Sequence, residues 1–209
     1  MEPLYHLTYG EGAVASPRLR TALAKFFNIQ FNLRQPVNEI EIMVGPGVTS
    51  LTDSLAWCTS SENVGIIIPR PLYNGFPADM RLRSEAMLLP ASFIWDSQRY
   101  SLDNALDAAA NVYALERAWK NCTSSGVTSK EALTAIARFC GEHNIHLTSD
   151  EIYATSVFPN EQYPNATLFT SVLSLELKGV IDPNLVHVMY GMSKMQKLII
   201  QWRRSLRVF

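Results

Sequence analysis

The sequence predicts an α/β protein with an open, mostly parallel sheet and flanking helices. Short continuous apolar runs, typical of strands buried on both faces, occur at residues 64–69 and 86–90. They alternate along the chain with longer segments of helical periodicity, and this alternation is typical of parallel sheets. The chain of 209 residues is long enough for one domain with a sizeable core.

The first half of the chain carries clear boundary signals. Ser16 as N-cap and Pro17 at the first helical position predict a helix over residues 16–27. Residues 39–58 are expected to form a strand, a glycine-rich turn and a helix. After the apolar runs, residues 101–122 are expected to form one helix or two in series.

The second half continues the alternation. Residues 129–144 have the pattern of an amphipathic helix, with Gly141 near its end. Residues 145–153 and 185–194 each read as a strand that runs into a loop. Internal repeats and low-complexity linkers are absent from the sequence, so one layered α/β unit is the expectation.

Composition excludes several function classes. The formal net charge is −1 with both signs interspersed, which predicts neither a nucleic-acid partner nor a membrane surface. The widely spaced Cys58, Cys122 and Cys140 are interpreted as buried thiols of a reducing compartment, and no secretion signal is evident. A cytoplasmic protein is therefore expected. The four histidines lack the spacing of metal ligands, so no metal site is predicted.

Four places follow predicted strands, and ligands of open α/β sheets bind beyond the carboxyl ends of strands. These places are residues 45–49, 69–76, 150–153 and 191–194. The first can hold a phosphate on backbone N–H groups at a helix N-terminus, or be a plain tight turn. It lacks the glycine spacing of a dinucleotide-binding fingerprint, which argues against a nucleotide-dependent oxidoreductase.

The other three places also have two interpretations each. Tyr73 is either a rim residue packed on the sheet or an aromatic plate for a ligand. Asp150 either caps the following turn or faces a cation. Lys194 is either a solvated strand end or an amine that attacks a carbonyl. Together the four places match one cofactor, pyridoxal 5′-phosphate, which needs a phosphate cradle, an aromatic, an acid and an amine.

A family resemblance rests on longer stretches in a fixed order. The stretches are "YGEGAVASPRLRTALAKFFN", "VGPGVTSLTDSLAW", "IPRPLYNGF", "ALTAIARFCGEHNIHLTSDEIYATSVF", "FTSVLSLE" and "VHVMYGMSK". They resemble the fold-type I pyridoxal-phosphate enzymes of aminotransferase class I/II, and within them the 1-aminocyclopropane-1-carboxylate synthase-like group. The resemblance implies that residues 1–194 form an incomplete cofactor-binding large domain, followed by a tail at 195–209 that does not match.

The resemblance also implies residue roles. Lys194 corresponds to the Schiff-base lysine, which also moves the proton at the substrate α-carbon, and Ser193 precedes it as expected. Asp150 corresponds to the partner of the pyridine nitrogen, and Tyr153 to the phenol that hydrogen-bonds the ring oxygen. The remaining implied positions are the ring-stacking Tyr73, the phosphate turn Gly47, Val48 and Thr49, and Tyr9, which in family dimers reaches the neighbouring subunit's site.

One lost phosphate contact, at Gly191, and three larger departures from the family pattern stand beside these matches. The family has a strand ending in an "NPHNPLG"-like turn where "TSSGVTSKEAL" here joins two helices directly, so a central strand and an asparagine ligand are missing. Gly191 occupies a position where many relatives carry a phosphate-binding hydroxyl. After Lys194, "MQKLIIQWRRSLRVF" matches neither the family's arginine loop nor its C-terminal small domain.

The expected function follows from lineage. The resemblance implies pyridoxal-phosphate-dependent chemistry on amino acids, either transamination or lyase chemistry of the synthase type, in a homodimer. The departures predict that this chain is impaired and does not turn over an amino acid. The alternative is a catalytically inactive fragment, or an interaction partner of a full-length subunit.

Overall fold

A computed structural model describes residues 15–62, 64–70, 72–92, 107–121, 129–159, 161–162, 164 and 168–192. Its helices and strands alternate as the sequence predicts. The helices are α1 (Pro17–Gln30), α2 (Val48–Thr59), α3 (Phe76–Arg81), α5 (Ala108–Asn121) and α6 (Lys130–Glu142). The strands are β1 (Gly65–Pro69), β2 (Met87–Ala91), β3 (Leu147–Asp150) and β4 (Val186–Met189). Short 3-10 turns are η2 (Glu39–Glu41), η3 (Ala154–Ser156), η4 (Val172–Ser174) and η5 (Pro183–Leu185).

The strands pair in parallel, as predicted, but in two separate sheets. β1 pairs with β2 in the register Gly65↔Met87, and β3 pairs with β4 in the register Leu147↔Val186. Among the described strands no pairing joins β1 to β3. The parallel sheet is therefore in two pieces, which agrees with the missing central strand expected from the sequence.

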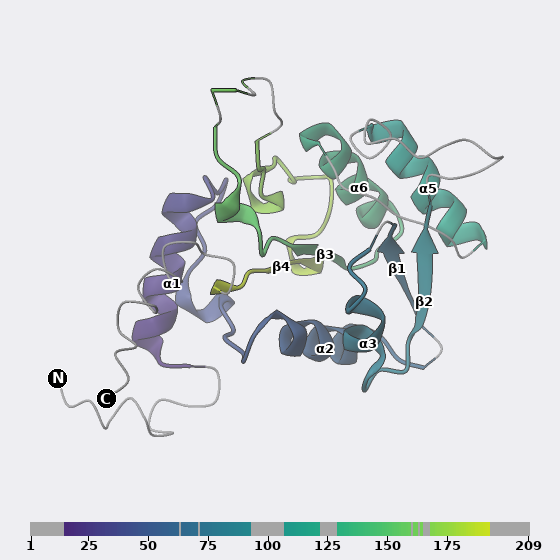
Figure 1. Ribbon diagram of the computed structural model, residues 1–209, viewed down its shortest axis with the longest axis horizontal. Coiled ribbons are helices and arrows are strands. Elements are labelled where there is room, and N and C mark those ends of the chain that lie inside the picture. Colours follow the sequence, from purple (N-terminus) through teal and green to yellow (C-terminus); the bar gives the residue numbers. More distant parts are fainter. Residues whose placement is uncertain are drawn as a thin grey trace.

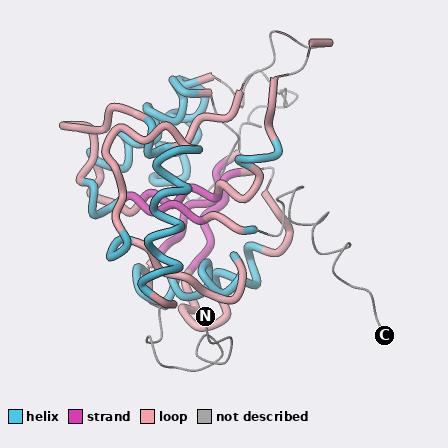
Figure 2. The backbone as a smooth tube through the Cα atoms, turned by 90° about the vertical axis from the view of Figure 1, so that its left-hand side faces the viewer, coloured by secondary structure: helices cyan, strands magenta, loops and turns pink. Residues whose placement is uncertain are grey.

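The strands lie between two helical layers (Figures 1 and 2). Helices α5 and α6 pack against each other on one side, and α2 and α3 lie together on the other. The main apolar cluster joins α6 and β3 to the segment that contains η4, and its most enclosed members are Ala137, Phe139 and Val172. The cluster includes Leu147, the first residue of β3, and so holds the start of that strand against α6.

Helix α1 begins as predicted and braces the end of β4. The Ser16 hydroxyl accepts the N–H of Leu19 at 3.1 Å, which satisfies one free donor of the first turn. The rings of Phe26, Phe27 and Phe31 all contact Tyr190, the residue after β4, with centroids 5.4–5.8 Å apart. Edge-to-face aromatic pairs of this kind stabilise packing beyond their buried area.

Two sequence expectations are wrong. The strand expected before the glycine-rich turn is instead η2, because the Asn38 side chain and Glu41 form a reciprocal capping box there. Ile40 is 80% exposed as a result. Cys58, expected to be buried, is an exposed thiol on α2, whereas Cys140 is buried on α6.

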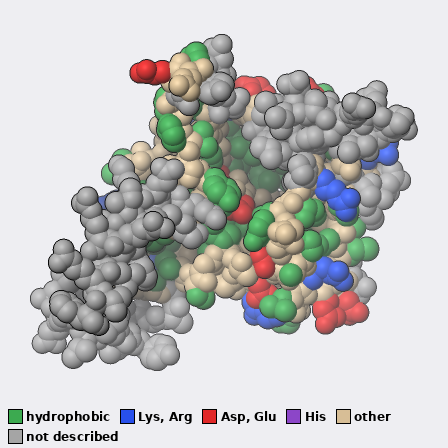
Figure 3. Space-filling model, in the orientation of Figure 1, with side chains coloured by type: hydrophobic (Ala, Val, Ile, Leu, Met, Phe, Trp, Pro, Cys, Tyr) green, Lys and Arg blue, Asp and Glu red, His purple; other side chains and the backbone are tan. Residues whose placement is uncertain are grey.

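Charge on the molecular surface is mixed. Positive and negative side chains are interspersed around α2 and α3 on the face shown in Figure 3. One such pair joins Arg83, just after α3, to Asp53 of α2, with Nη2 and Oδ2 2.6 Å apart. In the part of the chain that the structure describes, every helix is too short or too polar to cross a membrane.

A close helix approach gives the first prediction. A Cβ on Gly141 would collide with the carbonyl oxygen of Val180, so α6 can approach this segment only with glycine there. Gly141→Ala should therefore lower the free energy of unfolding by about 1–3 kcal/mol, the usual effect of overpacking. Helix propensity alone predicts the opposite sign, a gain of about 1 kcal/mol. Urea denaturation measures the difference.

The neighbouring Glu142→Ala is the matched control. Glu142 is exposed on the same helix, so its replacement should change the free energy of unfolding by less than about 0.5 kcal/mol. A Gly141→Ala variant as stable as the control would show that α6 does not approach Val180 closely.

Candidate active site

The N-terminus of α2 is open for an anion. Gly47 adopts φ 93°, a left-handed conformation that glycine reaches without a side-chain penalty, and its N–H donates to Gly45 O at 2.8 Å. Within the described chain no side chain caps this helix end. The N–H groups of the first turn and the helix dipole together favour a negative group at this place.

The hydroxyls of this turn are already engaged. The Thr49 hydroxyl donates to Asp79 Oδ2 of α3 at 3.2 Å, and the Ser50 hydroxyl donates to Gly47 O at 3.1 Å. These contacts fix the turn against α3. An anion here would therefore be held first by the backbone N–H groups of Val48 and its neighbours.

Asp150 is the last residue of β3 and lies at one end of a cavity. Its Oδ1 accepts the N–H of Ile152 at 3.1 Å, so the turn cap that the sequence offered as one interpretation is present. Oδ2 is left for another donor. Burial raises the pKa of Asp150, and the hydrogen bond from Ile152 opposes this. The side chain is nevertheless at the surface and reachable.

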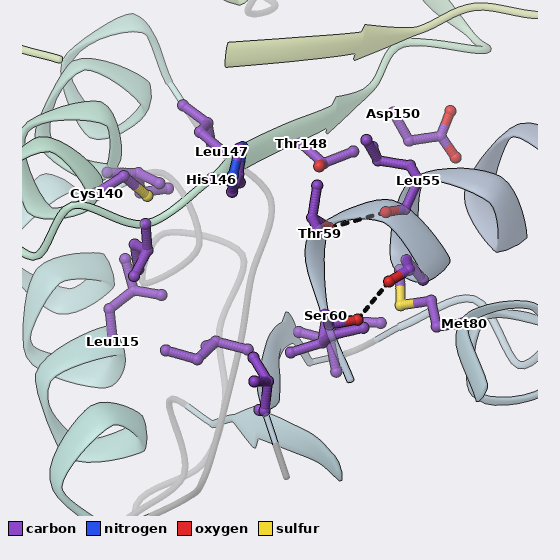
Figure 4. Close-up of a pocket in the computed structure, with 18 of the residues that line it drawn as sticks. Leu55, Thr59, Ser60, Met80, Leu115, Cys140, His146, Leu147, Thr148 and Asp150 are labelled. Atoms are coloured by element: carbon purple, nitrogen blue, oxygen red, sulfur yellow. Dashed lines mark hydrogen bonds between the residues drawn. The ribbon is translucent and has the colours of Figure 1, made fainter. Parts of the chain in front are cut away.

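The cavity extends from Asp150 between the two sheets. Its volume is about 490 Å³, and its walls come from α2, β1, α3, α5, α6 and β3. Figure 4 places the Asp150 carboxylate at the opposite end from Leu115 and Cys140. At that opposite end, burial raises the pKa of the Cys140 thiol to about 12. The Asp150 end of the cavity is the one at the carboxyl end of β3.

Three of the four predicted places meet at one edge. A Cβ on Gly191 would lie 2.7 Å from Val48 Cγ2 and 3.2 Å from Ile152 Cδ1. The Thr52 hydroxyl of α2 also reaches the sulfur of Met189 at 3.5 Å. The start of α2 and the ends of β3 and β4 are therefore adjacent. The same contacts explain why residue 191 is glycine: a larger side chain would displace Val48.

The two predicted tyrosines lie at the rim. Tyr73 is 64% exposed and packs edge-to-face on Phe76, with centroids 5.5 Å apart. Phe76 lines the same cavity as Asp150. Tyr153 is 58% exposed and precedes η3. Both phenols are accessible from solvent, and their roles stay predictions.

Three predicted site residues, Tyr9, Ser193 and Lys194, lie outside the described residues. β4 ends at Met189, and the described chain continues beside Val48 and Ile152 to Met192. The assignments of Lys194 and Ser193 therefore rest on their position in the sequence just after this point.

Sequence analysis missed Glu151. This side chain is only 4% exposed, and its Oε1 accepts the N–H of Val172 at 2.9 Å and the hydroxyl of Ser149 at 3.1 Å. Burial raises its pKa, and hydrogen bonds from Val172, Ser171 and Ser149 oppose the shift. Glu151 thus ties the turn after Asp150 to a segment 21 residues away.

Comparisons with known proteins give the family. The family model described as aminotransferase class I and II matches residues 9–196. The chain belongs to this family. Its members depend on pyridoxal 5′-phosphate, which confirms the cofactor class and the fold class expected from the sequence.

Two relatives matched by sequence and one matched by structure illustrate this similarity. Aminotransferase verI of Clonostachys rogersoniana is 29% identical over 82% of this chain and 45% of its own length. The 1-aminocyclopropane-1-carboxylate synthase 6 of Arabidopsis thaliana is 27% identical over 85% of this chain and 37% of its own. A Thermus thermophilus aspartate aminotransferase variant superposes with a TM-score of 0.67 at 20% identity, over 88% of this chain and 45% of its own. The chain spans less than half the length of these relatives.

Glu151 generates the second prediction. A raised carboxyl pKa means that the folded state favours the neutral form. The stability from this group is present below the ordinary glutamate pKa and is lost as the pH rises through the raised value. Glu151→Gln should therefore flatten the fall in unfolding free energy as the pH rises above the ordinary glutamate pKa, measured by urea denaturation.

Comparison with Glu151→Ala separates the effect of the hydrogen bond on stability from the effect of the carboxyl charge. Glutamine retains an oxygen for the Val172 N–H, whereas alanine leaves this buried donor without its acceptor and should cost about 1–3 kcal/mol. Equal losses in the two variants, at every pH, would contradict the role given to this hydrogen bond.

Proposed function

We propose that this chain binds pyridoxal 5′-phosphate at the edge where α2, β3 and β4 meet, and that it serves chemistry at the α-carbon of amino acids. The reaction classes are transamination and the elimination chemistry of synthase-like relatives. The observation that supports the proposal is the packing of Gly191 on Val48 and Ile152, which places the α2 turn beside the residues that follow Asp150.

The residues of this edge fit the cofactor's two charged groups. The uncapped first turn of α2 suits the phosphate, because backbone N–H groups and the helix dipole both favour negative charge. Oδ2 of Asp150 is left to accept the N–H of the pyridine ring. When bound, the cofactor supplies an electron sink for negative charge that develops at the substrate α-carbon.

In this proposal the ionised carboxylate of Asp150 accepts a hydrogen bond from the pyridine N–H and so keeps the proton on the ring nitrogen. In the free chain burial raises the pKa of Asp150, and a cation beside it acts in the opposite direction by favouring the charged carboxylate. Cofactor binding should thus lower the pKa of Asp150 and keep it ionised. A charge-assisted hydrogen bond of this type is roughly twice as strong as a neutral one.

The other predicted residues complete the proposed site. Lys194 carries the cofactor and moves the α-carbon proton at its Nζ, with Ser193 beside it. Tyr153 donates to the ring oxygen, and Tyr73 covers one ring face at the rim where it packs on Phe76. Tyr9 contributes across a homodimer. The substrate is an amino acid.

The interrupted sheet favours a second candidate function, in which the chain binds the cofactor with little or no turnover. β1 and β3 do not pair in the described structure, and a cavity separates them. The segment that joins α5 to α6, residues 122–129, has eight residues, fewer than the roughly dozen that a crossover between parallel strands needs. Misplacing reacting groups by about 1 Å can reduce a rate by 10²-fold.

The third prediction tests the cofactor site. The chain incubated with pyridoxal 5′-phosphate and reduced with borohydride should carry the pyridoxyl label on Lys194, found by peptide mapping. Asp150→Asn should keep the fold yet weaken binding by about tenfold, because a charged acceptor becomes neutral and about 1.5–3 kcal/mol is at stake. Lys194→Ala is the control for nonspecific labelling. Label spread over surface lysines, with none at Lys194, would rule out the proposed site.

A turnover assay separates the two candidate functions. The chain incubated with pyridoxal 5′-phosphate, without borohydride, is assayed against a panel of amino acids and S-adenosylmethionine, with Lys194→Ala as the background. The interrupted sheet predicts rates indistinguishable from that background. Saturable turnover above it would reject the second candidate and retain the first.

The fourth prediction concerns assembly. Three large apolar side chains in the N-terminal part of the described chain, Ile29, Ile40 and Met43, are more than half exposed, and exposed apolar surface favours association. Sedimentation velocity should give a homodimer, and Ile40→Glu should shift it toward monomer. Ala22→Glu, which adds the same charge at an exposed position of α1, is the charge control. A wild-type monomer at micromolar concentration would contradict the dimer.

A further inference from the structure

Two histidines form a pair at the amino ends of β3 and β4. His146 directly precedes β3, and His187 is the second residue of β4. The Nδ1 atom of His146 lies 2.8 Å from Nε2 of His187, and the two ring centroids are 5.0 Å apart. The residues are 41 positions apart in the sequence, so spacing along the chain could not indicate that their nitrogens converge.

The sheet holds the two rings together. Thr148 of β3 pairs with His187 of β4 in the strand register. Side chains two positions apart on a strand point to the same face of a sheet, so His146 lies on the face that carries Thr148 and His187. The rings are therefore diagonal neighbours on paired strands, and the backbone hydrogen bonds of the sheet fix the positions from which they extend.

The pair offers neutral imidazole nitrogen. A hydrogen bond between two imidazole rings needs at least one neutral ring, because a protonated ring has no acceptor nitrogen. Burial lowers the pKa of His187, and the neighbouring ring of His146 lowers it further. The half-buried His187 thus favours its neutral form, which is the form of histidine that binds metal ions.

The separation of the two nitrogens matches that of adjacent ligands around a metal ion. With bonds of about 2.0 Å and an angle of about 90° at the metal, neighbouring nitrogen ligands lie about 2.8 Å apart. A tetrahedral ion with the same bonds would need about 3.3 Å. Tetragonal coordination by nitrogen is typical of Cu²⁺ and Ni²⁺, and imidazole is a preferred ligand of both ions.

We propose that His146 and His187 bind one divalent transition-metal ion of the Ni²⁺ or Cu²⁺ class as two adjacent ligands. The ion takes the place of the hydrogen between the rings, and the ring that donated this hydrogen carries its proton on the other nitrogen. Among the described residues, no group of three or more His, Cys, Asp or Glu side chains gathers around a possible metal position. Water therefore supplies the remaining ligands, which makes the site open and the ion exchangeable.

Solvent reaches this pair. His146 is exposed and lines the cavity beside the first residue of β3, whereas Asp150 is the last residue of that strand (Figure 4). The metal site is thus separate from the proposed cofactor site and does not depend on cofactor binding. An ion at this place links β3 to β4 through side chains, so it stabilises the folded chain according to its occupancy.

Isothermal titration calorimetry of the full chain with Ni²⁺ at neutral pH tests the assignment. The wild type should bind one ion per chain with a Kd in the micromolar range. His146→Ala should weaken binding at least about tenfold, an effect that even the loss of an outer partner of a ligand has on metal affinity. His143→Ala is the matched control, because His143 faces Glu116 and lies outside the pair. Mg²⁺, which prefers oxygen ligands, should not bind.

A stability measurement separates lost binding from lost folding. Ni²⁺ should raise the urea midpoint of the wild type and of His143→Ala, and leave that of His146→Ala unchanged. If circular dichroism shows that His146→Ala is unfolded, NMR of the wild type replaces the comparison: paramagnetic Ni²⁺ should broaden the ring signals of His146 and His187 before those of His143. Unchanged Ni²⁺ affinity in folded His146→Ala, an equal loss in His143→Ala, broadening that begins elsewhere, or a wild type that binds no Ni²⁺ would each overturn the proposal.

Discussion

The packing of Gly191 against Val48 and Ile152 is the constraint on which the site depends. Without a side chain at residue 191, the end of β4 can lie directly beside the start of α2 and the turn after β3. Three segments that are distant in the sequence, around residues 48, 152 and 191, then share one edge. Tyr190, held among the rings of Phe26, Phe27 and Phe31, fixes the backbone just before this contact. Helix α1 thus supports the site without contributing a reactive group.

The secondary structure was predictable where one signal dominated. β1 and β2 are short apolar runs, and α6 has a strong amphipathic pattern with Ser129 accepting the N–H of Ala132 at its start. The strand predicted at residues 39–44 was wrong because two local signals competed there. Its alternating isoleucines favour a strand, but a capping box between Asn38 and Glu41 forms locally, and no neighbouring strand pairs with it in the described structure. Local hydrogen bonds decided the outcome.

Some residues of the candidate site were likewise predictable from local sequence, and one was not. Gly47 and Asp150 were found from position alone, because a glycine turn before a helix and an acid at a strand end are local features. Glu151 could not be found in this way. Its role is set by Val172, whose N–H it accepts from 21 residues away, and no local pattern encodes that contact. An acid immediately after a site residue in an otherwise apolar stretch was the one available signal. The division of the sheet followed from the short link between the two helices.

Burial of Cys140 has a chemical consequence for an aldehyde cofactor. A thiol whose pKa is about 12 carries almost no thiolate at neutral pH, and the thiolate is the nucleophilic form. The cavity wall opposite Asp150 therefore does not compete with a lysine amine for a carbonyl carbon. By contrast, Cys58 is exposed on α2, outside this protected environment. Enclosure in the wall of the cavity thus makes the sulfur of Cys140 a weak nucleophile.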